Sequence, residues 1–148
     1  MKTYKVYAIS DGTVIDHIPR TKALKVVDIL GLENEGILTI GIGFSSKKLG
    51  RKDIIKIENK YLEKEETDRI SLIAPRATIN IIKDGTLTEK RTIEIPEDYT
   101  GIVKCLNPNC ITSRGEATTR FRTISKSPLT LRCYYCERIV REGEIEIL

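Results

Sequence analysis

The four cysteines constrain the fold of this 148-residue chain more than any other feature, because all of them follow residue 104. They form a C-x4-C-x22-C-x2-C pattern, in which two close pairs flank a stretch long enough for a β-hairpin. Zn²⁺ prefers four soft ligands at the corners of a tetrahedron, and two tight turns can supply two thiolates each. The spacing therefore predicts one structural zinc ion per chain, bound by Cys105, Cys110, Cys133 and Cys136.

Two disulfides are the alternative use of four cysteines. The first ten residues, MKTYKVYAIS, are too short and too polar for the apolar region of a signal peptide. We therefore expect a cytoplasmic protein in a reducing compartment, which favours zinc over disulfides. A redox role for Cys133-Tyr-Tyr-Cys136 would need a βαβ context that the flanking sequence does not predict. Because four thiolates fill a tetrahedral site, no position is left for a catalytic water, and the predicted site is structural.

Composition is that of a globular chain, with 40% hydrophobic and 31% charged residues. No apolar run approaches the ~20 residues that span a bilayer, so we expect no membrane association. The net charge of +4 falls by two when four thiolates bind Zn²⁺, which is low for a protein that follows a phosphate backbone. A zinc-ribbon nucleic-acid-binding protein nevertheless stays as the alternative hypothesis. Its candidate contacts are Arg114, Arg120, Arg122, Lys126 and Arg132.

The hydrophobic pattern of the N-terminal two thirds predicts an α+β fold. It indicates a ferredoxin-like split βαβ unit with an antiparallel sheet and two helices, and an extra hairpin strand at each end. Thr21 is the candidate N-cap and Gly31 the candidate C-cap of the first helix, whose apolar face would include Leu24. Strands are expected at 1–10, 13–18, 37–44, 51–58, 77–82 and 86–95, and helices at 21–30 and 62–73.

The chain is expected to form two domains. Residues 1–96 would be the first domain, 97–101 a polar and turn-rich linker, and 102–148 a small all-β zinc-binding domain. The last segment has few large apolar residues, so we expect metal binding to supply much of its folding free energy.

Side chains suited to catalysis are scarce. His17 is the only histidine, and on a regular strand its side chain would point away from the face that carries Asp16. Lys52 and Lys56 would share one face of a strand, where they could hold different parts of a nucleoside triphosphate or form a solvated basic stripe. Asn80 at a strand position could contact a base or ribose, or satisfy a bulge. The sequence therefore favours a binding protein over an enzyme.

Four motifs, taken together, resemble the regulatory chain of aspartate carbamoyltransferase. They are Thr-Val-Ile-Asp-His-Ile-Pro at 13–19, Gly-Arg-Lys-Asp-Ile-Ile-Lys-Ile-Glu-Asn at 50–59, Ala-Pro-Arg-Ala-Thr-Ile-Asn at 74–80, and the paired cysteines with Cys-Tyr-Tyr-Cys-Glu at 133–137. The resemblance implies a non-catalytic allosteric subunit of pyrimidine biosynthesis. Its first domain would bind nucleotide effectors such as CTP and ATP, with UTP also conceivable, and its zinc domain would dock on the catalytic chain.

The resemblance also implies an effector pocket. Lys56 would contact the base and ribose, and Lys90 with His17 the phosphates. Ala8 and Ile9 would line the base side through backbone groups. Gly85 departs from the family, which can carry a large side chain there. The implied pocket residues are Ala8, Ile9, Asp16, His17, Lys52, Lys56, Asn80, Ile82, Gly85, Leu87 and Lys90.

The implied partners are other protein chains, with no nucleic acid and no membrane. Asn107, Asn109 and Arg138 are the candidate contacts with the catalytic chain. The family assembly implies a regulatory-chain homodimer within a dodecamer of two catalytic trimers and three regulatory dimers. The alternative role for the two asparagines is to brace the turns of the zinc knuckle.

Overall fold

The computed structural model describes residues 8–148. The chain forms two compact units, Met1–Ile93 and Glu94–Leu148. Most of the strand expected at 1–10 lies outside the described residues, and residues 8–10 are not in a strand. The expected linker, 97–101, holds a short strand, β6 (Asp98–Thr100), that pairs within the second unit.

The first unit has the topology expected of a ferredoxin-like fold. In the part of the chain that the structure describes, its antiparallel sheet has the order β2-β3-β1-β4-β5, so that β1 lies in the centre. The elements are β1 (Gly12–Pro19), α1 (Ala23–Leu30), the 3₁₀ turn η1 (Leu32–Asn34), β2 (Leu38–Ser46), β3 (Gly50–Glu58), α2 (Lys64–Ser71), β4 (Thr78–Lys83) and β5 (Thr86–Thr92).

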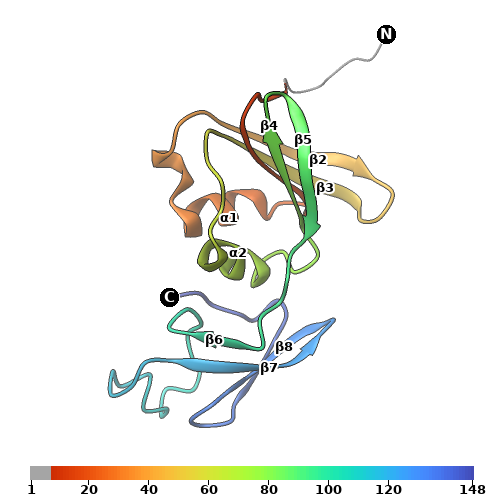
Figure 1. Ribbon diagram of the computed structural model, residues 1–148. Coiled ribbons are helices and arrows are strands. Elements are labelled where there is room, and N and C mark those ends of the chain that lie inside the picture. Colours follow the sequence, from red (N-terminus) through yellow and green to blue (C-terminus); the bar gives the residue numbers. More distant parts are fainter. Residues whose placement is uncertain (1–7) are drawn as a thin grey trace. The chain divides into compact units, whose positions relative to one another are not determined.

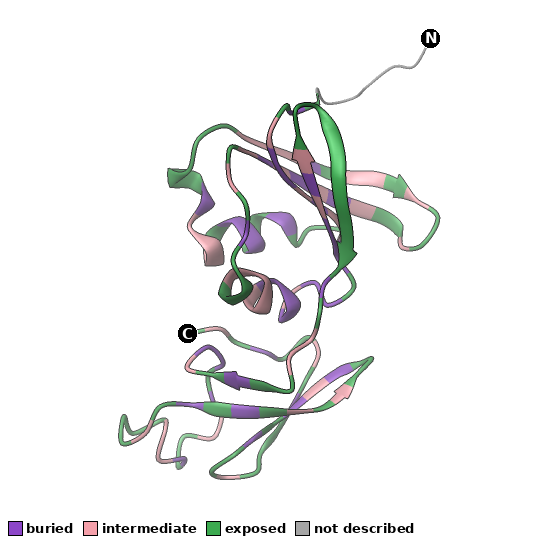
Figure 2. Cartoon of the chain, in the orientation of Figure 1, coloured by how far each residue is buried: buried purple, intermediate pink, exposed green. Residues whose placement is uncertain are grey.

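The two helices lie on one face of this sheet and leave the other face open (Figure 1). Alternate residues of the central strands, such as Ile15, Ile55 and Ile79, are buried against Val26 of α1 and Ile70 of α2. Figure 2 shows this alternation of buried and less buried positions, and shows β5 exposed along its whole length. The residues between the buried ones therefore point to the face without helices, which we call the open face.

The first helix begins one residue later than Thr21 would require. Its N-cap is Lys22, which makes no side-chain capping bond. The N–H of Ala23 instead donates to Oδ2 of Asp53 on β3 at 3.1 Å, and Oδ1 of Asp53 accepts the N–H of Gly43 at 3.1 Å. The Asp53 side chain is fully buried. A carboxylate from a distant strand therefore fixes both the start of α1 and the neighbouring bend of β2.

The predicted C-cap of α1 is confirmed, whereas its predicted buried face is corrected at Leu24. Gly31 is the C-cap, with φ of 62°, as predicted. Leu24, expected on the buried face, is 59% exposed, whereas Val26 is fully buried. The buried face of the helix is formed by Ala23, Val26 and Val27, and Leu24 lies outside it.

Strand β2 contains an irregularity near its two glycines, Gly41 and Gly43. The pairing of β2 with β3 shifts register between Gly41 and Phe44. A Cβ atom on Gly41 would lie 1.9 Å from Cε2 of Phe44. The Phe44 ring thus occupies the space that a side chain at position 41 would need.

We expect Gly41→Ala to lower the free energy of unfolding by about 1–3 kcal/mol, because the Phe44 ring must move from its packed position. Urea unfolding measures this change. Gly36→Ala is the matched control, since its new Cβ would lie 3.9 Å from the Glu58 carbonyl oxygen, an ordinary contact. Equal stability of the two variants would contradict the prediction.

The second unit is a small all-β fold, as expected. Its sheet has the order β6-β7-β8-β9, with β7 (Arg120–Lys126), β8 (Leu129–Cys133) and β9 (Ile139–Arg141). Its apolar interior includes Tyr99, Phe121, Leu129 and Leu131, which are almost completely buried. A core of this size is marginal for a free-standing unit, which agrees with a need for metal.

Neither helix in residues 8–148 has the length and apolar character needed to cross a membrane, since α1 and α2 have eight residues each.

Candidate functional site

The four cysteines converge in the second unit. Cys105 and Cys110 come from the loop after β6, Cys133 ends β8, and Cys136 follows in the next turn. Their sulfur atoms all lie within 4.8 Å of one another. Three of the four residues are buried, and Cys136 is half-buried.

The spacing of the sulfur atoms fits a metal and excludes disulfides. Sγ of Cys105 lies 3.6 Å from Sγ of Cys136, and Sγ of Cys110 lies 3.8 Å from Sγ of Cys133. A disulfide needs about 2.05 Å. A tetrahedron with Zn–S bonds of about 2.3 Å has edges of about 3.8 Å. The donor set therefore matches a four-thiolate metal site, and the disulfide alternative is wrong.

The thiols of Cys105, Cys110 and Cys133 differ in acidity. Burial raises the pKa of Cys105 to about 12, and burial also raises the pKa of Cys133. Burial acts in the same direction on Cys110, but hydrogen bonds from the hydroxyl and backbone N–H of Thr112 lower its pKa to about 6. Of these three thiols, Cys110 therefore ionises most easily, and a bound cation would hold the cysteines as thiolates.

The knuckle between Cys105 and Cys110 is braced by its asparagines. Oδ1 of Asn107 accepts the N–H of Asn109 at 3.0 Å, and the Asn107 carbonyl accepts a hydrogen bond from the Ser113 hydroxyl at 2.7 Å. Asn109 and Arg138 are exposed. The side chain of Asn107 thus has a structural use, while Asn109 and Arg138 remain predicted contacts for a partner.

The open face of the first unit brings most of the predicted nucleotide ligands together. The strand register places Val14 opposite Lys56 on one side and Asn80 on the other, and Asn80 opposite Lys90. One row across four strands therefore reads Lys56, Val14, Asn80, Lys90. With neighbouring strands about 4.8 Å apart, the Cα atoms of the two lysines are separated by about 14 Å.

A second row on the open face carries the apolar residues predicted for the base. Gly12 pairs with Glu58 and with Ile82, and Ile82 pairs with Leu87. The turn between β4 and β5 is tied to the start of the described chain, since the N–H of Gly85 donates to the Ser10 carbonyl at 2.8 Å. Gly85 thereby lies near the segment that contains the exposed Ala8 and the buried Ile9.

The backbone conformation at position 85 favours glycine. Its φ is +73°, and it follows Asp84 with φ of 51°, which is the backbone of a tight hairpin turn. Among residues 8–148, beyond its chain neighbours, no atom lies within 4 Å of the position that its Cβ would take. The turn therefore favours glycine, while the space beside it is open.

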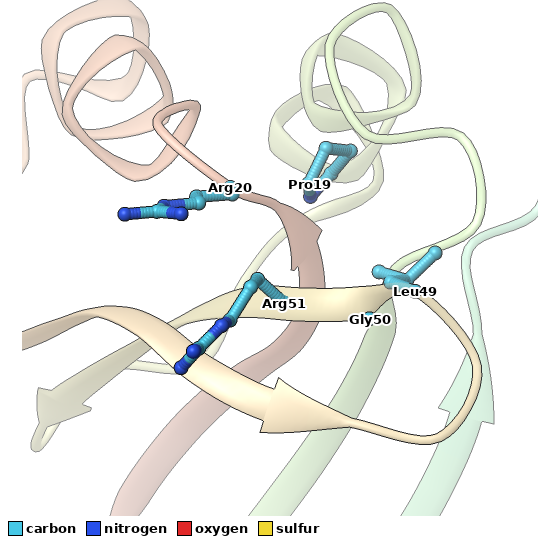
Figure 3. Close-up of a pocket in the computed structure, with 5 residues that line it drawn as sticks. All are labelled: Pro19, Arg20, Leu49, Gly50 and Arg51. Atoms are coloured by element: carbon cyan, nitrogen blue, oxygen red, sulfur yellow. The ribbon is translucent and has the colours of Figure 1, made fainter.

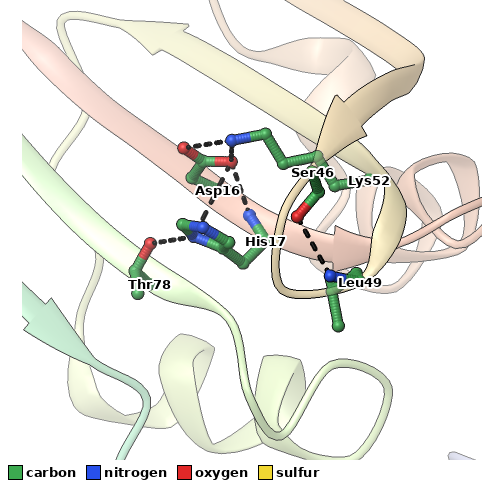
Figure 4. Close-up of polar contacts among 6 residues, drawn as sticks. All are labelled: Asp16, His17, Ser46, Leu49, Lys52 and Thr78. Atoms are coloured by element: carbon green, nitrogen blue, oxygen red, sulfur yellow. Dashed lines mark hydrogen bonds and ion pairs between the residues drawn. The ribbon is translucent and has the colours of Figure 1, made fainter.

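Asp16 and His17 lie closer together than a regular strand allows, which corrects the prediction that they point to opposite faces. A β-bulge between Ile15 and Ile18 gives His17 a φ of 58°. Nδ1 of His17 lies 3.1 Å from the Thr78 hydroxyl and 3.9 Å from Oδ1 of Asp16 (Figure 4). The bulge is thus what turns the imidazole toward the neighbouring strand β4.

Lys52 is already engaged by a carboxylate. Its Nζ lies 2.9 Å from Oδ1 of Asp16, and both side chains are about one-fifth exposed or less (Figure 4). The same figure shows Ser46 accepting the N–H of Leu49, which closes the β2–β3 hairpin beside Lys52. Lys52 therefore brings less net positive charge to the open face than its position suggests.

A hollow of about 510 Å³ lies at the end of the β2–β3 hairpin, away from the predicted ligands. Its walls include the guanidinium-bearing Arg20 and Arg51 (Figure 3). Arg51 donates to the Gly43 carbonyl at 3.0 Å. Arg51 and Lys52 are neighbours on β3 and point to opposite faces, so this hollow is separate from the open face.

Two residues in the first unit were not singled out from the sequence. Asp53 caps α1, as described above. Glu58 has a carboxylate oxygen, Oε2, that exposes less than 1 Å² and has no hydrogen-bond partner among the described residues, and Oδ1 of Asn80 is in the same state. The strand alternation that places Lys56 on the open face also places Glu58 there, and could have drawn attention to it.

The two units coincide with the two parts of one protein family. Residues 4–94 match the family described as aspartate carbamoyltransferase regulatory chain, allosteric domain, and residues 97–146 match the metal binding domain of the same chain. The chain belongs to the aspartate carbamoyltransferase regulatory chain family. The four converging cysteines lie within the range matched by the metal binding domain.

Archaeal relatives carry the same family name over nearly their whole length. The aspartate carbamoyltransferase regulatory chain of Thermococcus sibiricus is 52% identical over 145 residues, covering 98% of this chain and 97% of its own. That of Thermococcus kodakarensis is 54% identical over 143 residues, covering 95% and 94%. That of Pyrococcus horikoshii is 53% identical over 148 residues, covering 98% and 97%.

Family membership decides between the functions considered from the sequence. The protein is a regulatory chain in pyrimidine biosynthesis, with an allosteric and a metal-binding domain, and the catalytic function belongs to another chain. A zinc-ribbon nucleic-acid-binding protein is not favoured. The resemblance read from the four sequence motifs is confirmed.

Proposed function

We propose that the open face of the first unit binds a nucleoside triphosphate such as CTP or ATP, and that this binding regulates the catalytic chain. The row that joins Lys56, Val14, Asn80 and Lys90 carries the proposal. Two ammonium groups at its ends suit a long polyanion. Between them, Oδ1 of Asn80 has no hydrogen-bond partner among the described residues and could accept one from the ligand.

Roles for the other predicted residues follow from their places around this row. Lys90 and His17 would hold phosphates, and Lys56 the base and ribose. Asp16 would keep Lys52 in place through their ion pair. The wall formed by Ile82, Gly85 and Leu87, together with Ala8 and Ile9, would enclose the base. Gly85 leaves open space beside its backbone, so a large base fits there without a stacking side chain.

The metal in the second unit is proposed to be zinc, bound by Cys105, Cys110, Cys133 and Cys136. The sulfur spacing supports this choice, because thiolate tetrahedra are typical of structural zinc. The ion would shape the knuckle through which Asn109, Asn107 and Arg138 contact the catalytic chain. A reducing compartment such as the cytoplasm suits thiols that are free in the structure.

The allosteric units are proposed to pair through β2, one of the two edge strands of the first sheet. Apolar side chains are exposed at or beside this edge, with Ile37 at 58% and Ile42 at 50% exposure. The other edge, β5, carries Glu89, Lys90 and Arg91, which discourage pairing. A homodimer of this kind fits a dodecamer of two catalytic trimers and three regulatory dimers.

Lys56→Ala is expected to weaken CTP and ATP binding about 10–100-fold, because it removes a charged hydrogen bond from the proposed site. Calorimetric titration of the full zinc-loaded chain measures this, with a random oligonucleotide as a further ligand. Zinc content should stay unchanged.

Lys25→Ala is the matched control, since Lys25 is exposed on α1, on the face that carries the helices. It should bind both triphosphates as the unaltered chain does. Unchanged affinity in Lys56→Ala would refute the proposed location. Binding of the oligonucleotide without a saturable triphosphate site would refute the proposed function.

A further inference from the structure

We propose that Glu58 is an additional ligand-binding residue, whose carboxylate accepts a hydrogen bond from the nucleoside part of the effector. This inference rests on the proposed function and adds a determinant of specificity to it. The donor is either an amino group of the base or a hydroxyl of the ribose, both of which offer the same hydrogen-bond chemistry.

The first observation is the state of the Glu58 carboxylate. Its Oε2 atom exposes less than 1 Å² and has no hydrogen-bond partner among the described residues. An ionised carboxylate can only accept hydrogen bonds. Burial without a donor is unfavourable, and each such group in a folded protein calls for an explanation. A bound ligand that supplies the donor is such an explanation.

The second observation is where this carboxylate lies. Ile57 is fully buried on the face that carries the helices, so the next residue, Glu58, belongs to the open face. Gly12 is the residue of β1 between Glu58 and Ile82, and a glycine places no side chain there. The strip of sheet that connects the carboxylate to the apolar wall of the proposed site is therefore not covered by a β1 side chain.

The third observation is the order of charges along β3. Lys52, Lys56 and Glu58 share one face, and Glu58 lies about 7 Å beyond Lys56, on the side away from Lys52. His17 and the Asp16–Lys52 ion pair lie toward the opposite end, where the phosphates are proposed. A carboxylate near a triphosphate would repel it. Glu58 therefore suits the nucleoside, which carries the ligand's hydrogen-bond donors.

Calorimetry on the full zinc-loaded chain tests this with Glu58→Leu, Glu58→Gln and the control Glu33→Leu, whose side chain is exposed on η1. Glu58→Leu is expected to weaken ATP binding about 10–100-fold. Glu58→Gln keeps an acceptor oxygen and should retain most of the affinity. Glu33→Leu should bind as the unaltered chain does.

Ligand analogues identify the donor. Purine riboside triphosphate lacks the amino group of ATP, and the 2′-deoxy and 3′-deoxy forms of ATP each lack one ribose hydroxyl. For the analogue that lacks the partner of Glu58, the Glu58→Leu change should cause no further loss. An equal loss for every analogue would overturn the assignment of a direct hydrogen bond.

Thermal unfolding of the ligand-free chain separates binding from a structural role. Because Glu58→Leu removes an unpartnered buried oxygen, its Tm should equal or exceed that of the unaltered chain. A clearly lower Tm would indicate a structural residue and overturn the inference. If Lys56→Ala abolishes ATP binding and Glu58→Leu does not alter it, the inference fails while the proposed function stands. If the unaltered chain binds no triphosphate, the proposed function itself fails.

Discussion

Removal of the metal from the intact chain is expected to unfold the second unit and to leave the first unit folded. The second unit has a small apolar interior, and its loops around Cys105, Cys110 and Cys136 are held by their convergence on one point. Metal binding to such sites contributes on the order of 10 kcal/mol to folding. Without the ion, burial disfavours the charged form of Cys105 and Cys133. No disulfide joins the four cysteines, all of which lie in the described part of the chain.

Limited proteolysis before and after chelation measures this outcome. Cleavage should appear throughout residues 94–148 of the metal-free chain, while a fragment ending near residue 93 resists. Addition of zinc should restore protection, which is the control for damage by the chelator. A second unit that resists protease equally well without metal would refute the prediction.

The same treatment should release the chain from the catalytic chain. The proposed contact residues Asn107 and Asn109 lie in the turn between Cys105 and Cys110. The shape of this turn therefore depends on where the metal holds these two cysteines. Gel filtration of the complex after chelation follows the release. Continued co-elution of the two chains would contradict the proposed role of the knuckle.

Asp53→Ala is expected to lower the free energy of unfolding of the first unit by about 2–5 kcal/mol. The fully buried carboxylate accepts two backbone N–H groups, from Ala23 and Gly43, and no other acceptor for them is evident among the described residues. A buried donor without a partner costs about 1–3 kcal/mol. The variant also removes the capping group of α1.

Urea unfolding with Asp28→Ala as control measures the loss, since Asp28 is an exposed aspartate on the same helix. Asp53→Asn keeps one acceptor oxygen, so its loss of unfolding free energy should lie between those of Asp53→Ala and Asp28→Ala. Amide hydrogen exchange at Ala23 and Gly43 should be faster in Asp53→Ala. A loss no larger than that of the control would show that the two N–H groups find other partners.

Local patterns were sufficient to predict most of the first unit. Alternation in β1, β3 and β4, the turn at Asp84-Gly85 and the αL cap at Gly31 depend on residues close in sequence. The start of α1 does not, because its cap comes from Asp53, 30 residues further along the chain. The position of Thr21, a good capping residue in a suitable place, therefore predicted the wrong N-cap.

The site was predicted less completely than the fold, for a related reason. The cysteine spacing alone predicted the metal ligands that the structure brings together. The bulge that brings His17 near Asp16 requires one extra residue against β3, which alternation cannot foresee. Nothing in the local sequence distinguishes Glu58 from a solvent-exposed glutamate. Only the folded sheet shows that its Oε2 is buried and has no hydrogen-bond partner within residues 8–148.

The division of the chain into two units has a consequence for the order of folding during synthesis. Every element of the ferredoxin-like sheet lies before residue 94, whereas the metal ligands begin at Cys105 and are complete only at Cys136. Domains generally fold as units as they emerge from the ribosome. The first unit can thus be complete before the nascent chain has a single cysteine with which to bind metal. Metal supply would then limit the last stage of maturation and not the first.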